Sequence, residues 1–312
     1  MTVLICGSFA FDNIMVFKDR FKNHILPDKV HILNVCFLAP EMRREFGGCA
    51  GNIAYNLQLL GGNPLPMGTV GEDFDAYAQW MDRHGIDRRL VTVVENTFTA
   101  RAFVTTDMDD NQITAFHPGA MEFAHRNQVD QAGKVALGIV SPDGREGMLQ
   151  HAEQFAAAEI PFIFDPGQGL PMFNADELKR FISQATWLAV NDYEWQLIKD
   201  RTGLSVEQVA AELEALIITR GGEGSYIHTG GRRIDIPAAQ ARELNDPTGC
   251  GDAYRAGLLF GLSKGYDWEK TGRIASLMGA FKIEHHGTQN HHFDPPTFAE
   301  RFQREFGFAL EV

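Results

Sequence analysis

The sequence predicts an α/β fold with a mostly parallel central sheet and a second, smaller sheet beside it. After residue 130, short apolar runs alternate with amphipathic stretches. This alternation is typical of βαβ units, in which helices cover both faces of a parallel sheet. Two irregular, β-prone segments, at about 11–46 and 97–120, do not fit the alternation. We expect these two segments to build the smaller sheet, as a lid.

In the N-terminal half, the sequence predicts a strand, a helix and a hairpin. The apolar run 3–6 predicts a buried strand that ends at a glycine. Residues 52–60 predict a helix, because their apolar residues share one helical face and a glycine pair follows. Residues 97–106 and 112–116 flank a turn rich in acidic and amide residues, Asp107 to Asn111, and predict a β-hairpin.

The C-terminal half supplies most of the predicted parallel sheet. Its strands are expected at 135–140, 161–164, 187–190 and 216–219, and its helices at 146–158, 176–185 and 206–213. Within the first lid segment, residues 30–37 are β-prone and no helix is evident.

Composition excludes several classes of protein. The formal net charge of −13 argues against a nucleic-acid binder, which needs a basic surface, and against an electrostatic membrane anchor. The start of the chain lacks the basic region of a signal peptide, and no apolar stretch approaches the roughly 18 residues that span a bilayer. The four cysteines lie far apart and form no CxxC pair. We therefore expect a cytoplasmic protein.

The strongest chemical signal is the glycine-rich turn 245–252, which opens directly into an apolar helix. The backbone N–H groups of Gly249, Cys250 and Gly251 would lie at the helix N-terminus and could bind an anion. Asp252, just inside the helix, is placed to take a proton from a hydroxyl that attacks a bound phosphoryl group. The alternative is an Asp-Pro turn in which Asp252 is a favourable first-turn acid.

A second glycine-rich turn contains Gly47 and Gly48 and leads to Asn52. Glycines let a ligand approach the backbone closely, and the Asn52 amide both donates and accepts hydrogen bonds. The alternative is a structural turn in which Asn52 caps the helix. The sequence holds no GxxxxGK[ST] phosphate-binding loop.

Further polar residues follow the predicted parallel strands, at the edge where α/β folds bind ligands. Asn191 and Glu194 follow the strand 187–190, and Glu194 could hold the waters of a magnesium ion. A helix cap with a first-turn acid explains this pair equally well. Asp12, Asp165–Gly169 and Thr219–Gly224 occupy similar positions after other strands.

Taken together, these residues resemble the ribokinase-like carbohydrate and nucleoside kinases, the PfkB family. The resemblance covers nearly the whole chain, and the order and spacing of its parts are specific. It is carried by Gly7 with Asp12, Gly47-Gly48 with Asn52, Gly68–Asp73, Asn191 with Glu194, Thr219–Gly221 and Asp246–Asp252.

The resemblance implies a single ribokinase-like α/β/α domain over residues 1–312, with a lid, that uses ATP to phosphorylate a hydroxyl group. Asp252 would be the general base, and Gly249, Cys250 and Gly251 the anion hole. Residues implied to bind substrate are Asp12, Asn13, Gly47, Gly48, Asn52, Phe116 and Gln168. Residues implied to face ATP are Asn191, Glu194, Thr219, Gly221, Gly224 and Thr248. The family more often has Ala at position 250 and Thr at position 247.

Within the family, the chain resembles bacterial nucleoside kinases with adenosine kinase activity most closely. This implies phosphorylation of the 5′-hydroxyl of a purine-type nucleoside, such as adenosine, inosine or guanosine, in purine salvage. The aromatic side chains of the lid segments suit a flat base, whereas a sugar-phosphate kinase would need basic residues there. The alternatives are a ribose or other sugar kinase and a non-catalytic nucleoside-binding protein.

The implied cofactors are Mg²⁺, held through water by Glu194, and K⁺ at Asp246 as a further candidate. The histidine pairs 285–286 and 291–292 lack the spacing of a helical metal site, and we expect no transition metal there. Cys250 is expected to be an inert buried thiol rather than a redox-sensitive one. A homodimer through the lid and a lid that covers only its own site are both compatible with the sequence.

Overall fold

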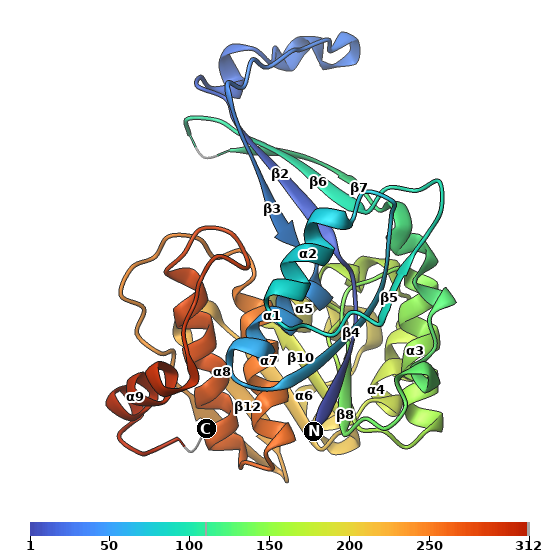
Figure 1. The fold of residues 1–312 in the computed structure, drawn as a ribbon, viewed down its shortest axis with the longest axis vertical. Helices are drawn as coiled ribbons and strands as arrows, with labels where there is room; N and C mark the ends of the chain where they lie inside the picture. Colours follow the sequence, from blue (N-terminus) through green and yellow to red (C-terminus); the bar gives the residue numbers. More distant parts are fainter. Residues whose placement is uncertain (110, 311–312) are drawn as a thin grey trace.

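The computed structural model describes residues 1–109 and 111–310. In this part of the chain, nine strands form the larger sheet in the order β13-β12-β11-β10-β9-β8-β1-β4-β5 (Figure 1). The seven strands from β11 to β5 are parallel, and β12 and β13 extend one edge in antiparallel fashion. The bounds are β1 Thr2–Cys6, β4 Asn63–Val70, β5 Leu90–Val93, β8 Leu137–Val140, β9 Phe162–Phe164, β10 Trp187–Asn191, β11 Ala215–Thr219, β12 Ser225–Thr229 and β13 Arg232–Ile236.

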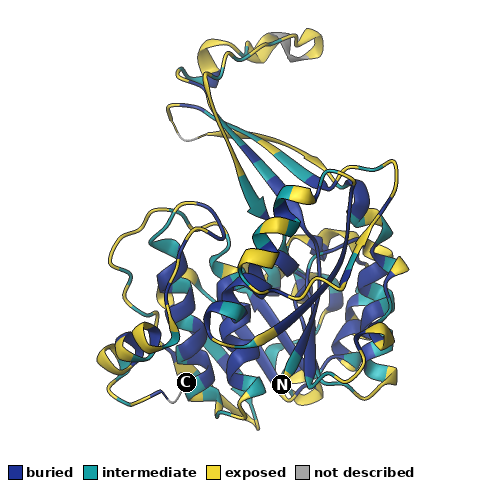
Figure 2. Ribbon diagram, in the orientation of Figure 1, coloured by how far each residue is buried: buried dark blue, intermediate teal, exposed yellow. Residues whose placement is uncertain are grey.

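The central strands are apolar because helices cover both faces of the sheet. In β1, Val3 and Ile5 pack into one hydrophobic cluster, whereas Leu4 and Cys6 pack into the other. Figure 2 shows these strands as the buried centre of the molecule. Helices α1 (Cys49–Leu59), α2 (Asp75–Arg83), α7 (Cys250–Ser263), α8 (Trp268–Ile283) and α9 (Pro295–Phe306) contribute to the first cluster. Helices α3 (Arg145–Ala157), α4 (Ala175–Gln184), α5 (Asp192–Thr202) and α6 (Val206–Glu212) contribute to the second.

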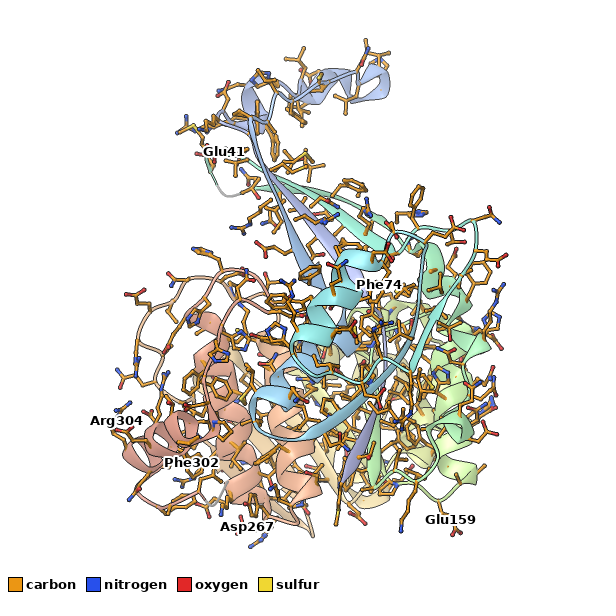
Figure 3. The ribbon with its side chains drawn as sticks, viewed as in Figure 1. Glu41, Phe74, Glu159, Asp267, Phe302 and Arg304 are labelled. Atoms are coloured by element: carbon orange, nitrogen blue, oxygen red, sulfur yellow. The ribbon has the colours of Figure 1, made fainter. Side chains whose placement is uncertain are left out.

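The smaller sheet has the order β3-β2-β6-β7 and extends beyond the larger one (Figure 1). Its strands are β2 (Ala10–Val16), β3 (Glu41–Gly47), β6 (Ala100–Thr106) and β7 (Gln112–His117). β2 and β6 are parallel, and the two outer pairs are antiparallel. Figure 3 labels Glu41, the first residue of β3, at the outer end of this sheet.

The chain between β2 and β3 projects from the end of the smaller sheet as an arm with two short 3₁₀ helices, Phe21–Asn23 and Pro27–Ile32 (Figure 1). The prediction of β-structure at 30–37 was therefore wrong. Aromatic contacts of Phe37 with Phe17 and Phe21 hold the end of this segment in place instead.

Most of the other predicted elements are confirmed. The strands expected at 3–6, 135–140, 161–164, 187–190 and 216–219 correspond to β1, β8, β9, β10 and β11. The hairpin is formed by β6 and β7, although Asp110 of its turn lies outside the described residues. α1 begins at Cys49, earlier than expected, because Gly48 rather than Asn52 is its N-cap. In the part of the chain that the structure describes, no helix is long and apolar enough to span a membrane.

Candidate active site

The loop before α7 presents a helix N-terminus to the carboxyl edge of the larger sheet. Gly249 is the N-cap, with φ of +80°, a backbone conformation that favours glycine. Among the described residues, nothing lies within 4 Å of where a Cβ would be at Gly251, so an anion can approach its backbone closely. The Cys250 N–H donates to the Pro247 carbonyl at 3.2 Å. One of the three expected donors is therefore engaged in the turn.

Asp252 and Asn52 come together although they are 200 residues apart in the chain. Nδ2 of Asn52 donates to Oδ2 of Asp252 at 2.8 Å. Asn52 lies inside α1, is 4% exposed, and has its backbone carbonyl bound by the side chain of Asn56. The interpretation of Asn52 as a helix cap was therefore wrong. Its amide instead supports the carboxylate expected to act as a base.

The surroundings of Asp252 suit a general base. Burial, together with the neighbouring Asp165, raises the pKa of Asp252 to about 6, against the effects of the Asn52 hydrogen bond and Arg255. The neighbouring thiol of Cys49 acts in the same direction as Asn52 and lowers the pKa of Asp252. A carboxyl with a pKa near 6 is largely ionised at neutral pH and is a stronger base than an ordinary aspartate.

Asp12 of β2 lies on the face of the smaller sheet that turns toward this site. A Cβ at Gly47 would come within 2.6 Å of Oδ2 of Asp12, so the second glycine turn and Asp12 are in contact. Burial, followed by the negative charges of Glu45 and Asp246, raises the pKa of Asp12 to about 6. Thr288, which packs against Gly249, donates its hydroxyl to the Phe46 carbonyl at 2.6 Å, so the loop before α7 lies near the end of β3.

Two other residues expected to bind substrate lie in the smaller sheet. Phe116 is on the same face as Asp12, whereas Asn13 is on the opposite face. Strand register pairs Asp12 with Ala102 and Ala102 with Phe116, whereas side chains alternate along a strand. Asn13 therefore points to the opposite face, where it donates to the Ala102 carbonyl at 3.3 Å. Placing Asn13 beside Asp12 in the substrate site was an error that strand alternation corrects.

Gln168 and Gly48 belong to different elements, Gly48 being the N-cap of α1. Gln168 is exposed in the 3₁₀ helix Gly167–Met172 that follows β9. Gly48 has φ of +87° and is packed against the backbone of residues 8–10, which joins the second glycine turn to the end of β1.

Of the residues expected to face ATP, Thr248 lies in the loop before α7, and the others lie at or after the ends of β10 and β11. Register pairs Asn191 directly with Thr219. Asn191 and Glu194 form a reciprocal capping box at the start of α5, so their structural interpretation is confirmed. Gly221 and Gly224 flank the short turn that leads to β12, and both have positive φ.

A buried ionic cluster lies beneath the two halves of the site. Arg255 donates to Asp165 at 3.0 Å and to the Ala189 carbonyl at 3.1 Å, and its guanidinium is 4.0 Å from Glu194. Burial and the charge of Asp165 raise the pKa of Glu194, against the effect of Arg255. The sequence indicated no role for Arg255, although its position one turn after Asp252 places both on one helical face.

Glu194 has the ligand type that magnesium prefers, a carboxylate, and its Oε2 also accepts the Asn191 N–H at 2.8 Å and lies 4.0 Å from Arg255. Among the described residues, no group of three His, Cys, Asp or Glu side chains could hold a metal ion by itself. A magnesium ion here would thus be shared between Glu194, water and a bound triphosphate. Asp165, the other carboxylate near Glu194, adds to the local negative charge.

Asp246 does not fit a monovalent cation in this chain. Its carboxylate accepts the N–H groups of Thr248 and Gly287, both at 2.9 Å. Although burial raises the pKa of Asp246, these bonds hold it below the usual value. Its carbonyl accepts the fully buried ammonium of Lys282 at 2.7 Å, so a positive charge is already present.

Cys250 and His291 are both uncharged at neutral pH in the structure. Burial raises the pKa of Cys250 to about 11, which makes it an unreactive thiol at neutral pH. His291 is buried, and its Nε2 lies 2.7 Å from the side-chain oxygen of Asn56. Burial also lowers the pKa of His291 to about 3, so it is a neutral core residue.

Sequence reasoning missed three residues that support the site, of which Tyr77 and Gln289 are buried and Trp80 is half-buried. Tyr77, Trp80 and Gln289 form hydrogen bonds behind Asn52. Such residues carry no recognisable spacing, because they come from α2 and from the loop after α8. Only the tertiary structure brings them together.

Comparisons with known proteins agree with this geometry. Residues 26–294 match the sequence model described as pfkB family carbohydrate kinase. The chain is similar to a nucleoside kinase of Methanocaldococcus jannaschii, with 32% identity over 82% of this chain and 85% of that protein. It is also similar to a nucleoside kinase of Methanothermobacter thermautotrophicus, with 31% identity over 99% of this chain and 98% of that protein.

Among solved structures, the chain is similar to the Burkholderia thailandensis nucleoside kinase in complex with inosine. The identity is 51%, the TM-score is 0.90, and each chain is covered completely. A structure of the same protein in complex with ADP-inosine has 53% identity and a TM-score of 0.88, and covers 100% of this chain and 98% of that one. From the family match and these relatives we conclude that the chain belongs to the pfkB family of carbohydrate kinases.

Proposed function

We propose that the chain is an ATP-dependent nucleoside kinase that phosphorylates the 5′-hydroxyl of a purine-type nucleoside. The observation that carries the proposal is the bond between Asn52 and Asp252, which joins the expected ribose site to the expected base. The relative from Burkholderia thailandensis, solved with inosine and with ADP-inosine, supports a purine nucleoside and an adenine nucleotide as the two ligands.

In the proposed reaction, the nucleoside hydroxyl attacks the γ-phosphoryl group of ATP in line. Asp252 accepts the hydroxyl proton as the new O–P bond forms and ADP leaves. The backbone N–H of Gly251 and the N-terminal dipole of α7 stabilise the negative charge on the transferring group. Magnesium, when bound, neutralises charge on the phosphate oxygens. Asp12 and Asn52 hold the ribose hydroxyls and orient the nucleophile.

The smaller sheet would act as the lid of this site. Asp12 and Phe116 share its inner face, one offering a carboxylate for the ribose and the other an aromatic ring for the base. Phe116 is 53% exposed, which leaves its ring accessible to a ligand. Closure of the lid would exclude water, which otherwise competes with the nucleoside as acceptor.

We also propose that the smaller sheet mediates a homodimer in the cytoplasm. β7 is an edge strand with every residue exposed, and such an edge can pair with a second copy. Among the described side chains of the arm between β2 and β3, Leu26, Ile32, Leu33 and Leu38 are apolar and exposed. Light scattering of the wild type and of the Leu38→Glu variant tests this proposal; a wild type that is monomeric at micromolar concentration contradicts it.

A substrate panel tests the function. The purified chain, ATP and Mg²⁺ are mixed with adenosine, inosine, guanosine or free ribose, and ADP release is measured with and without K⁺. We expect turnover with the nucleosides, including adenosine, as purine salvage requires. Phosphorylation of ribose but of no nucleoside would instead indicate a sugar kinase. Nucleoside binding by calorimetry without ADP release would indicate a non-catalytic binding protein.

A further inference from the structure

A chain of polar side chains leads from α2 to Asp252. Nε1 of Trp80 donates to Oε1 of Gln289 at 2.9 Å. Nε2 of Gln289 donates to Oδ1 of Asn52, also at 2.9 Å. Nδ2 of Asn52 then donates to Oδ2 of Asp252 at 2.8 Å. Three hydrogen bonds therefore connect an indole on one helix to the carboxylate on another.

The direction of this chain follows from the indole. The N–H of Trp80 can only donate, so the amide of Gln289 must turn its oxygen toward it. The NH₂ group of Gln289 then faces Asn52, whose own oxygen must accept. The NH₂ group of Asn52 is left to face Asp252. One obligate donor thus determines the orientation of two amides.

Tyr77 reinforces the same direction. Its hydroxyl donates its single proton to the Gly47 carbonyl at 2.9 Å and accepts from Nε2 of Gln289 at 2.6 Å. Gly51 makes this approach feasible, because a Cβ there would lie 1.9 Å from the Tyr77 hydroxyl. A reversed Gln289 amide would therefore face two groups with the wrong polarity.

Burial makes reversal costly. Gln289 is 2% exposed, Asn52 is 4% exposed and Tyr77 is fully buried. In such surroundings, no bulk water replaces a hydrogen bond lost on reversal, and an unpaired polar atom carries its full desolvation cost. The amides therefore keep the orientation that their neighbours impose.

We propose that Trp80 is a positioning residue whose indole N–H holds Gln289 and Asn52 in the orientation that makes Asn52 a donor to Asp252. The inference rests on the proposed function, in which Asp252 is the base. A reversed Asn52 would place its oxygen against the carboxylate. That contact favours protonated Asp252, which cannot accept the proton of the nucleoside hydroxyl.

Apart from Asn52, the groups that face Asp252 make no hydrogen bond to Trp80 in the described part of the structure. They are the carboxylate of Asp165, the guanidinium of Arg255, the thiols of Cys49 and Cys250, and the phenol of Tyr77. A change in the titration of Asp252 after substitution at Trp80 therefore reports the orientation of the amides.

The Trp80→Phe variant removes the donor and keeps an aromatic ring against Phe46, with which Trp80 stacks at 5.4 Å. The matched control is Trp187→Phe, because Nε1 of Trp187 is buried with no hydrogen-bond partner among the described residues. Carbon-13 NMR of protein labelled at aspartate carboxyl carbons follows the titration of Asp252, whose signal is assigned by its loss in Asp252→Asn.

We expect the Asp252 midpoint to rise by about one pH unit in Trp80→Phe and to stay unchanged in Trp187→Phe. At pH 6, kcat should fall about fivefold, since fewer molecules carry the ionised base. The KM for the nucleoside should rise because Asn52 also faces the ribose, whereas the KM for ATP should not change. A role in packing alone would leave the midpoint in place.

The Gln289→Met variant removes the hydrogen bonds of Gln289 to Trp80 and Asn52 without adding a charge. It serves as the test if Trp80→Phe does not fold. It too should raise the midpoint. The proposal is overturned if the Asp252 midpoint is unchanged in the variant that folds, Trp80→Phe or Gln289→Met. It is also overturned if the midpoint rises equally in Trp187→Phe. If wild-type protein does not phosphorylate nucleosides, the proposed function fails, whereas the midpoints still decide the role of Trp80.

Discussion

The guanidinium of Arg255 and the carboxylate of Asp165 are 3.0 Å apart and almost fully buried, with side-chain exposures of 5% and 6%. Arg255 extends from α7, and Asp165 follows β9. Their contact therefore joins the helix that carries Asp252 to the carboxyl edge of the larger sheet. Because Glu194 is within 4.0 Å of the same guanidinium, one cation holds both acidic residues behind the site.

Replacement of this cation should destabilise the protein strongly. Arg255→Met leaves Asp165 buried without its partner, which typically costs about 3–5 kcal/mol in the free energy of unfolding. The control is Arg88→Met, which removes an exposed ion pair with Asp82 and should cost at most about 1 kcal/mol. Urea unfolding measures both. Equal losses in the two variants would contradict the assigned importance of the buried pair.

Loss of the base should abolish most turnover and leave binding intact. Asp252→Asn keeps the size of the side chain but cannot accept a proton, so kcat should fall by about 10²- to 10⁴-fold. Nucleoside affinity, measured by calorimetry, should change little. The control is Asp267→Asn at the N-cap of α8, which Figure 3 places at the end of the molecule away from the smaller sheet. Near-normal turnover in Asp252→Asn would remove this residue from the mechanism.

Activity should fall in mild acid. The base works as a carboxylate, and burial raises the pKa of Asp252 to about 6. The rate should therefore be maximal above pH 7 and drop about tenfold per unit well below pH 6. Asp12 has a similarly raised pKa, so the profile of kcat is measured at saturating nucleoside and repeated with Asp12→Asn. A profile in Asp12→Asn that no longer falls would assign the acid limb to Asp12 instead.

Asp143 should make stability depend on pH in the opposite sense to an ordinary salt-bridged aspartate. Burial raises its pKa to about 8, and its Oδ2 has no partner among the described residues. The folded state therefore binds this proton more tightly than the unfolded state. Between pH 4 and 8, wild-type stability should fall by up to about 1.4 kcal/mol per unit relative to Asp143→Asn. Parallel stability curves for the two proteins would refute this.

The turn at Gly48 should not tolerate a side chain. Its φ is +87°, and a Cβ would lie 2.5 Å from the Ser8 carbonyl oxygen and 2.6 Å from the Ala10 nitrogen. Gly48→Ala should therefore destabilise the protein by more than about 1 kcal/mol. Gly279→Ala, in the interior of α8 with open space around it in the described structure, should stabilise it by up to about 1 kcal/mol. Urea unfolding separates the two; a loss in both would show that the strain is not specific to Gly48.

The sequence by itself determined the α/β class, the parallel strands and the motif at Asp252. These features depend on local patterns: continuous apolar strands such as β8, helices at regular spacing, and a glycine turn before an apolar helix. Local pattern failed where long-range contacts decide the backbone. Residues 30–37 are β-prone, but in the described structure they pair with no strand.

Only the tertiary structure decided which side chains meet. Asn13 lies on the face opposite Asp12. Asn52 donates to Asp252 instead of capping a helix. The ammonium of Lys282 donates to the carbonyl of Asp246. Partners such as Gln289 and Asn52 are more than 200 residues apart in the chain. Hydrogen bonds depend on distance and direction in space, and no spacing along the sequence encodes either.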